Sequence, residues 1–449
     1  MIVLGFSCAH RPSTRDASDP PSDSGSPSIS LAELKPGQWK VVIRTARPTV
    51  GLRFDRNPDD SRSRRWQVEP GLELVHEGGI DVLRRKDRAS FQTASLIVPA
   101  LYVAQPKEYP PFSPYSDGGT LIYTGQFHIC PALSACPSDE RWQMEVTPPR
   151  GAHLLVDGVP RESAFTFTDT GGGINIYVGK SEPLTSSHFV AVIDPGLPRE
   201  VIAALYRLLP PMMDFFTTRL GRLSLKPMLF ASLDPDPPKN SGFSMQGSAL
   251  PGQIAFHLYG ENWARAAADD LLDQLPWMFA HEASHLFQSM DLTGDSYPEA
   301  QSWIHEGGAE AFAALAVGKF GGLPPELVQR RIDRELTECA AGLQALSGKP
   351  LNASFEAGAF RNYYTCGLVM QLAIDAEAKR RSEGAHDLFD VWAQFLSRVR
   401  AGEPFNQDTF LRTASDLGAI NATTFARTLA TVPQEDPLHF LRVGLNEAR

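Results

Sequence analysis

Long hydrophobic runs are missing from this sequence of 449 residues. No stretch reaches the roughly eighteen consecutive apolar residues that a membrane-spanning helix needs, so we expect no transmembrane span. Lysine and arginine never gather densely enough to follow a phosphate backbone, and the formal net charge is -10. These absences exclude an integral helical membrane protein and count against nucleic acid as a partner.

Cysteine is also scarce, with five in the chain and no CxxC pair of the kind that forms a cysteine zinc site. Setting Cys8 aside leaves Cys130, Cys136, Cys339 and Cys366, which is an even number that can pair. Cys130 and Cys136 bracket a short loop, whereas Cys339 and Cys366 lie in separate helical segments. We expect disulfides in an exported protein, with buried free thiols as the alternative.

Large apolar side chains are almost absent from residues 9–30, which are rich in Ser, Pro and Asp. Such a segment cannot bury itself, so we expect a flexible tether over residues 1–30. A short apolar run precedes Cys8, as at the terminus of a bacterial lipoprotein whose signal is truncated or whose start is misassigned. We therefore expect an exported, periplasmic or cell-surface lipoprotein anchored at Cys8. Phe6 stands where a small residue is usual, so an ordinary disordered terminus is the alternative.

Short apolar alternations separated by Gly, Pro and Asp fill the first part of the chain, over residues 31–194. This pattern predicts a β-rich, sandwich-like N-terminal domain. The expected strands include residues 40–44, 72–76, 120–123, 153–156 and 174–178.

Helical periodicity begins near residue 201 and dominates beyond residue 266. Residues 201–220 predict a helix, and residues 227–233 and 253–259 still predict strands, so a small α/β lobe is expected to begin at about residue 195. Gly/Pro breaks near residues 321–325, 348–350 and 402–404 divide the helices that follow.

One short motif can bind a metal, the HEASH sequence at residues 281–285. It lies in an apolar-periodic run that follows Pro276, as expected of a helix. Residues four apart lie on one helical face about 6 Å apart, so His281 and His285 can bind the same ion. Glu282 projects about 100° away, where it can activate a water beside the metal.

A third ligand is expected from a second helical run that opens with WIHEGGAE, residues 303–310. Glu306 supplies the carboxylate, and two neutral imidazoles with one carboxylate leave a net positive ion that can acidify a bound water. Glu310, one turn later, is expected to accept a hydrogen bond from a ligand imidazole. A solvated helix carboxylate is the alternative for Glu310.

Together these two motifs resemble those of the gluzincin zinc metallopeptidases, in the branch of aminopeptidase N, leukotriene A hydrolase and glycyl aminopeptidase. That branch follows HExxH with a helix of W-L-x-E-G-x-A pattern, which residues 303–309 match closely, after a slightly longer spacing. The resemblance implies one zinc ion per chain, held by His281, His285 and Glu306, with Glu282 as the general base.

The same resemblance implies an α+β multidomain fold. A β-rich, sandwich-like N-terminal domain would be followed by a thermolysin-like α/β catalytic lobe over residues 195–320. A mostly helical C-terminal domain would then occupy residues 321–449.

A further match begins at Tyr364, where the sequence YTCG precedes an apolar helical segment and resembles the family's Y-x-x-G helix. The resemblance implies that Tyr364 donates a hydrogen bond to the oxyanion of the tetrahedral intermediate. Tyr363 is the alternative register. A core tyrosine at the start of a helix is the third interpretation.

The family's G-x-M-E-N strand, whose glutamate binds the free amino group of the substrate, is not matched. The nearest residue, Gln246, lacks the charge to pair with an ammonium group, and Glu261 is a substitute without a supporting motif. The strand over residues 253–259 is expected to lie along the cleft and pair with the substrate backbone. His257 on that strand is expected to be structural.

We therefore expect a zinc metallopeptidase that hydrolyses peptide bonds of a peptide or protein substrate through a zinc-bound water activated by Glu282. Aminopeptidase specificity stays open because the amino-binding glutamate is missing. A non-catalytic binding or scaffold protein with the same fold is the alternative, although the intact Glu282 argues against it. Hydrolysis of a non-peptide bond at the same zinc is a third possibility.

Overall fold

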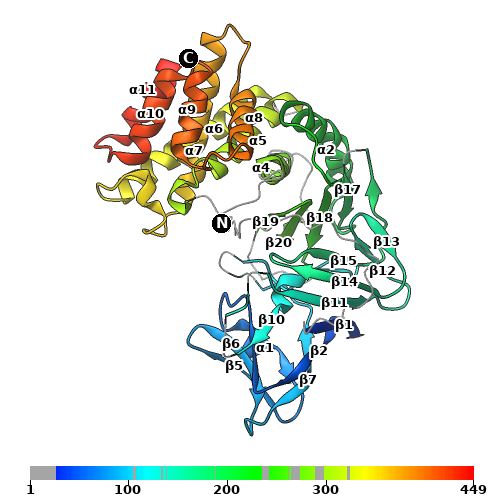
Figure 1. Cartoon of the computed structure of the whole chain (residues 1–449). Helices are drawn as coiled ribbons and strands as arrows, with labels where there is room; N and C mark the ends of the chain where they lie inside the picture. The colour runs from blue at the N-terminus through cyan, green and yellow to red at the C-terminus, as the bar shows by residue number, and fades with distance from the viewer. Residues whose placement is uncertain are drawn as a thin grey trace. The chain divides into compact units, whose positions relative to one another are not determined.

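The computed structural model describes residues 27–448 except 104, 106–107, 133–134, 138, 188, 235–241, 261, 264–273, 289–297 and 321–323. The chain forms two compact units, each made from two segments. The first unit comprises Met1–Pro198 and Lys226–Ala266, and the second comprises Arg199–Leu225 and Ala267–Arg449. The named strands all lie in the first unit and the longer helices in the second (Figure 1).

The first unit begins with fifteen short strands, a one-turn helix α1 (Ser61–Arg65) and a 3-10 turn η1 (Thr124–Phe127). The strands are β1 Ser28–Lys35, β2 Gln38–Thr49, β3 Gly51–Phe54, β4 Gln67–Val68, β5 Leu72–Glu77, β6 Ile80–Arg85, β7 Phe91–Pro99, β8 Phe112–Pro114, β9 Thr120–Tyr123, β10 Ile129–Pro131, β11 Arg141–Thr147, β12 His153–Val156, β13 Val159–Arg161, β14 Phe165–Thr170 and β15 Asn175–Gly179. Because Ile29 and Leu31 alternate inward, β1 begins inside the predicted tether, and residues 28–30 belong to the sheet. Cys8 lies outside the described residues.

These strands form three sheets with one shared apolar core. The strand orders are β14-β11-β1-β2-β7-β4, β10-β3-β6-β5 and β13-β12-β15-β9-β8. Val41 on β2, Leu83 on β6 and Ile122 on β9 belong to the same cluster of buried side chains, so all three sheets contribute to it. The predicted β-rich N-terminal region is confirmed.

A fourth sheet completes the first unit with β16 (Leu184–Thr185), β17 (Val190–Ile193), β18 (Met228–Leu233), β19 (Ser244–Leu250) and β20 (Gln253–Tyr259). Its order is β16-β17-β18-β20-β19, with β17, β18 and β20 parallel and β19 antiparallel to β20. The expectation that β20 pairs with substrate is wrong, because β18 and β19 already occupy both of its edges. Among the described strands, β19 pairs with β20 alone, so β19 has the edge that strand addition requires.

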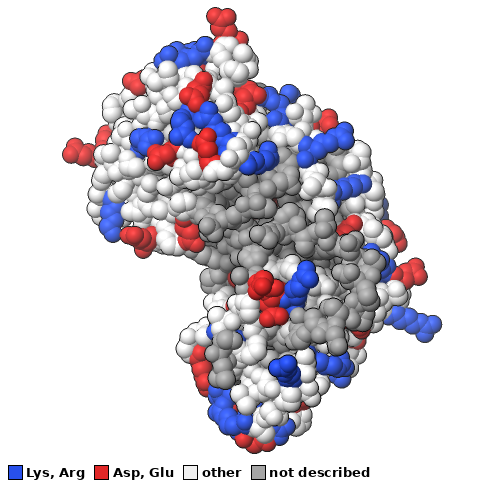
Figure 2. Space-filling model, viewed as in Figure 1, with Lys and Arg blue, Asp and Glu red and all other residues white. Residues whose placement is uncertain are grey.

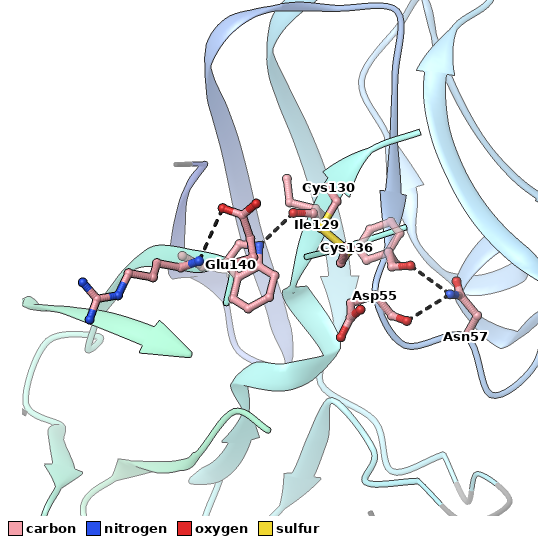
Figure 3. Close-up of a disulfide and its surroundings, with 9 residues drawn as sticks. Asp55, Asn57, Ile129, Cys130, Cys136 and Glu140 are labelled. Carbon is pink, nitrogen blue, oxygen red and sulfur yellow. Dashed lines mark hydrogen bonds between the residues drawn. A yellow bond between two sulfur atoms is a disulfide. The ribbon is translucent and has the colours of Figure 1, made fainter. Parts of the chain in front are cut away.

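A disulfide between Cys130 and Cys136 closes the loop that follows β10 (Figure 3). Nearby, the Trp142 indole donates a hydrogen bond to the Ile129 carbonyl at 2.7 Å. The Asn57 side chain donates to the Phe54 carbonyl at 2.8 Å, at the end of β3, the strand that pairs with β10. The paired strands β10 and β3 are therefore held near their ends by the disulfide and by hydrogen bonds from the Trp142 and Asn57 side chains.

Helices make up the second unit, and the predicted helical C-terminal region is confirmed. They are α2 Arg199–Leu220, α4 Leu275–Gln288, α5 His305–Phe320, α6 Pro325–Ala345, α7 Arg361–Arg381, α8 Leu388–Arg400, α9 Gln407–Asp416, α10 Ile420–Thr431 and α11 Pro437–Ala448, with 3-10 turns η3 Glu299–Gln301 and η4 Leu351–Ser354. Every residue of α4 is buried, and α5 is buried from its start to Ala314. A helix that is covered on all sides is an internal helix, so α4 and α5 form the centre of this unit.

Two glycines let α5 and α7 cross with their backbones in contact. A Cβ built on Gly307 of α5 would lie 2.3 Å from the Gly367 Cα, and one built on Gly367 would lie 2.6 Å from the Gly307 Cα. No side chain fits between the helices at this point. The crossing brings Glu306 and Tyr364, which flank the two glycines, into the same region of the unit.

The Cys339–Cys366 disulfide joins α6 to α7 just beside this crossing. None of the described helices has the length and apolar character needed to cross a membrane. On the face drawn in Figure 2, acidic and basic side chains are interspersed over the described surface.

Candidate metal centre

His281 and His285 on α4 and Glu306 on α5 direct one ligand atom each toward a common point. The Nε2 atoms of the two histidines are 3.1 Å apart. Glu306 Oε2 lies 3.5 Å from His281 Nε2 and 3.6 Å from His285 Nε2. Ligands held about 2.0–2.1 Å from a tetrahedral ion are about 3.3–3.4 Å apart, so these separations fit a zinc ion.

The electrostatics of the three ligands also fit a cation. Glu306 Oε2 is buried and has no hydrogen-bond partner among the described residues. Burial and the charges of His305 and His281 hold the pKa of His285 well below its ordinary value, so His285 is neutral, as a metal ligand must be. Burial opposes protonation of His281, yet the carboxylates of Glu306 and Glu310 raise its pKa to about 10. The surroundings of the three ligand atoms therefore favour a positive charge.

Glu282 lies beside the three ligands on α4 and is fully buried. Neither of its carboxylate oxygens has a hydrogen-bond partner among the described residues. Burial raises the pKa of Glu282 to about 8 with help from Glu306 and Glu310, against the opposing effect of His281. A buried carboxylate left without partners is costly, and such groups are typical of sites that transfer protons.

Glu310 is buried on α5, which rules out the solvated alternative. Its Oε1 lies 3.3 Å from His281 Nδ1, and its Oε2 accepts a hydrogen bond of 2.6 Å from the Trp277 indole. Burial opposes its ionisation, but His281, Arg331 and Arg361 lower the pKa of Glu310 to about 2. The ionised Glu310 carboxylate therefore faces Nδ1 of His281, the ring nitrogen that is not directed at the metal position.

The two adjacent tyrosines of α7 have different surroundings. The Tyr364 ring stacks 5.8 Å from the His281 ring, and its hydroxyl hydrogen-bonds Glu306, which partly offsets the effect of burial in raising the pKa of that carboxyl. The Tyr363 hydroxyl instead accepts a hydrogen bond from the Phe355 amide at 2.9 Å and donates to the Asn352 carbonyl at 3.3 Å. Tyr364 is thus the tyrosine beside the candidate centre.

Comparison of the sequence with known families finds no matching family model, and no curated protein matches it. Solved structures do match. An aminopeptidase N family protein from Idiomarina loihiensis has a TM-score of 0.66 at 12% identity, covering 93% of this chain and 78% of that protein. Yeast LTA4 hydrolase has a TM-score of 0.52 at 9% identity, covering 92% of this chain and 68% of that enzyme. The chain has the gluzincin fold.

Two further side chains of the candidate centre were missed from the sequence, Gln288 on α4 and His305 on α5. His285 Nδ1 lies 2.8 Å from Gln288 Oε1 and 3.1 Å from His305 Nε2, and the rings of His285 and His305 stack at 4.2 Å. Gln288 had a signal in the sequence, because it follows His285 by three residues and so lies one turn along the same helical face.

The residues considered for substrate binding belong to the first unit. Gln246 lies on β19, and its side-chain oxygen accepts a hydrogen bond from the Tyr102 hydroxyl. The Tyr102 ring stacks on His257, whose Nδ1 lies 2.8 Å from Ser232 Oγ. Glu261 lies outside the described residues. His257 is thus buried among side-chain partners, as expected of a structural residue.

Proposed function

We propose that this chain is a zinc-dependent metallopeptidase that cleaves peptide bonds by attack of a water activated by Glu282. The observation that carries the proposal is the convergence of His281, His285 and Glu306 at tetrahedral separations beside a buried carboxylate without partners. When bound, a zinc ion would lower the pKa of a water and polarise the substrate carbonyl.

Glu282 acts as the general base in this proposal. Neither of its oxygens has a partner among the described residues, and burial raises its pKa, so the ionised Glu282 carboxylate is a stronger base than an exposed one and can accept a proton from the attacking water. The same carboxyl then protonates the leaving amine, because expulsion of an unprotonated amine from the tetrahedral intermediate is unfavourable. One residue thus acts as base and then as acid.

Tyr364 is proposed to stabilise the oxyanion that develops during the attack. Its ring lies against His281 and its hydroxyl reaches the ligand Glu306, so the hydroxyl lies beside the point where a substrate carbonyl would meet the metal. A donor placed in this way acts mainly on the transition state. Because the ligands, Glu282 and Tyr364 are all present together, nothing favours the non-catalytic alternative.

Gln246 argues against strict recognition of a free amino terminus. Its neutral amide cannot balance an ammonium charge, and its oxygen already accepts a hydrogen bond from Tyr102. We therefore propose peptide hydrolysis without assigning amino-terminal specificity.

The test measures zinc content and cleavage together. Purified protein should hold about one zinc per chain and cleave members of a mixed peptide library, with product ends identified by mass spectrometry. Glu282→Gln should keep the zinc and lose about 10²- to 10⁴-fold in rate, because it removes the base and no ligand. His285→Ala should lose the zinc. A wild-type protein without zinc, or a Glu282→Gln variant with near wild-type rate, would overturn the proposal.

We also propose that the protein works outside the reducing cytosol, because two disulfides tie its units internally. Thiol alkylation of the native protein without reductant should leave Cys130, Cys136, Cys339 and Cys366 unmodified. Alkylation of any of them would contradict export. Lipid attachment at Cys8 stays a prediction.

A further inference from the structure

Gln288 is a buried residue to which the proposed chemistry assigns no role. It is the last residue of α4, it is fully buried, and it contacts both helices that supply metal ligands. Its Oε1 lies 2.8 Å from His285 Nδ1 on its own helix. Its Nε2 donates a hydrogen bond of 3.0 Å to the His305 carbonyl, immediately before Glu306.

Resting on the zinc site proposed above, we propose that Gln288 is a positioning residue that fixes the tautomer of His285 and ties this ligand to the helix that carries Glu306. One amide would thereby set the geometry of two metal ligands on two helices. The two contacts of the Gln288 amide, at 2.8 and 3.0 Å, are shorter than the 3.3 Å between His281 Nδ1 and Glu310 Oε1, the corresponding contact of the other histidine ligand.

The orientation of the amide follows from the backbone group that it meets. A carbonyl oxygen only accepts hydrogen bonds, so the nitrogen of the Gln288 amide must face the His305 carbonyl. The amide oxygen then faces His285, and an oxygen only accepts, so His285 must carry its proton on Nδ1. This leaves the lone pair of His285 on Nε2, the atom that lies 3.1 Å from His281 Nε2.

Space for the amide depends on a glycine of α5. A Cβ built on Gly308 would lie 2.6 Å from Gln288 Nε2 and 2.5 Å from the Trp392 ring. Only glycine at this position lets the amide reach the carbonyl behind it. The second glycine of the EGG sequence thus makes room for the positioning residue, whereas the first forms the crossing with α7.

A neutral amide suits this position because the centre already holds several acids. Glu282, Glu306 and Glu310 are all buried around the two imidazoles. Gln288 holds His285 without adding another negative charge, whereas Glu310 faces His281 with a carboxylate. The two histidine ligands are therefore supported by different chemistry.

Gln371 on α7 provides a matched control. It is also fully buried, and its Nε2 donates a hydrogen bond of 2.7 Å to the Ile304 carbonyl, one residue before His305. Its Oε1 accepts a hydrogen bond of 2.8 Å from the Trp392 indole and touches no ligand. The two glutamines thus hold consecutive carbonyls at the start of α5, but only Gln288 also binds a histidine ligand.

The experiment compares zinc dissociation constants, measured by competition with a chelator, for wild type, Gln288→Met, Gln371→Met and Gln288→Glu. Loss of a group that orients a ligand typically weakens metal binding about 10- to 100-fold, and we expect this loss for Gln288→Met. Gln371→Met should stay within about threefold of wild type, although it removes the same kind of backbone contact. The cobalt-substituted Gln288→Met protein should also show a changed visible spectrum, because the His285 ring is no longer held.

Gln288→Glu keeps an oxygen acceptor for His285 but replaces the amide donor with a carboxylate oxygen that faces the His305 carbonyl. It should therefore also weaken zinc binding about 10-fold, which keeps the test decisive if Gln288→Met does not fold. Equal weakening in Gln288→Met and Gln371→Met, or wild-type affinity in Gln288→Met, would overturn the inference while leaving the peptidase proposal intact. Wild-type affinity in Gln288→Glu would also overturn it. Wild-type protein that binds no zinc would overturn both proposals.

Discussion

Tyr364 and Tyr363 are adjacent in sequence, yet their hydroxyl groups serve different parts of the molecule. Tyr364→Phe should lower kcat by about 10²-fold or more with little change in KM, because an oxyanion donor acts mainly in the transition state. Steady-state kinetics on any peptide identified as a substrate would measure the effect. The zinc content should not change, because no ligand is removed.

Tyr363→Phe is the matched control. It removes the hydroxyl that bonds Phe355 and Asn352 in and beside η4, so it should cost about 1 kcal/mol of stability and leave kcat near wild type. If Tyr363→Phe lost activity and Tyr364→Phe kept it, the oxyanion donor would be Tyr363 and not Tyr364. If both kept full activity, α7 would supply no catalytic group.

The residues of the candidate centre differ in how far the sequence could predict them. His281, His285 and Glu306 follow from helical spacing and a recognisable motif, since the ligands of one ion must face the same point. The preference for Tyr364 over Tyr363 rested on the resemblance alone, because both tyrosines begin the same helix and helical spacing does not show which hydroxyl η4 holds. His305 was missed because its contact with His285 depends on how α4 packs against α5.

At the scale of secondary structure, the α5–α7 crossing is the most sensitive point. Gly307→Ala would place a methyl carbon 2.3 Å from the Gly367 Cα, in a contact where only backbone could yield. Forcing the helices apart should cost about 1–3 kcal/mol or more and should displace Glu306. Chemical denaturation and zinc titration of the variant would measure both effects.

Gly318→Ala on the same helix is the control, because a Cβ there meets nothing within 4 Å. It should be neutral or stabilise the protein by about 0.5–1 kcal/mol, as expected for replacing an exposed helical glycine. Equal stability of the two alanine variants would mean that the backbones do not touch at Gly307.

Periodicity predicted the elements well wherever one face is buried. The expected strands at residues 72–76, 120–123 and 153–156 correspond to β5, β9 and β12 within a residue at each end. β19 was missed, since its sequence SMQGSAL lacks the β-branched residues and regular alternation of a typical strand. That omission also explains the wrong role given to β20, because pairing partners cannot be read from one strand alone.

For the whole molecule, each disulfide lies within a single unit. Cys130–Cys136 spans six residues in the first unit, and Cys339–Cys366 spans 27 in the second. Loop-closure entropy then predicts stabilisation of about 2 kcal/mol for the first and about 3.5 kcal/mol for the second. Replacing Cys339 and Cys366 by alanine should lower hydrogen-exchange protection in α6 and α7 and leave β3 and β10 unchanged.

Replacing Cys130 and Cys136 by alanine should give the opposite pattern, with a smaller loss confined to the strands. If either double-alanine variant lost protection equally in both units, the two units would unfold together as one cooperative body. The boundaries predicted at residues 194 and 320 stay predictions, and the compact units divide the chain differently.

The interleaving of the two units affects the order in which they can be completed during synthesis. Helix α2 leaves the ribosome before β18, β19 and β20, although it belongs with α4, α5 and α8, which come later. Its apolar side chains, such as Leu205, Met212 and Phe216, are buried in the finished protein. A nascent chain ending near residue 266 therefore holds a complete β-rich unit interrupted by a helix whose partners have yet to be translated. Neither unit corresponds to a contiguous stretch of the gene, so neither could be inherited or exchanged as a single cassette.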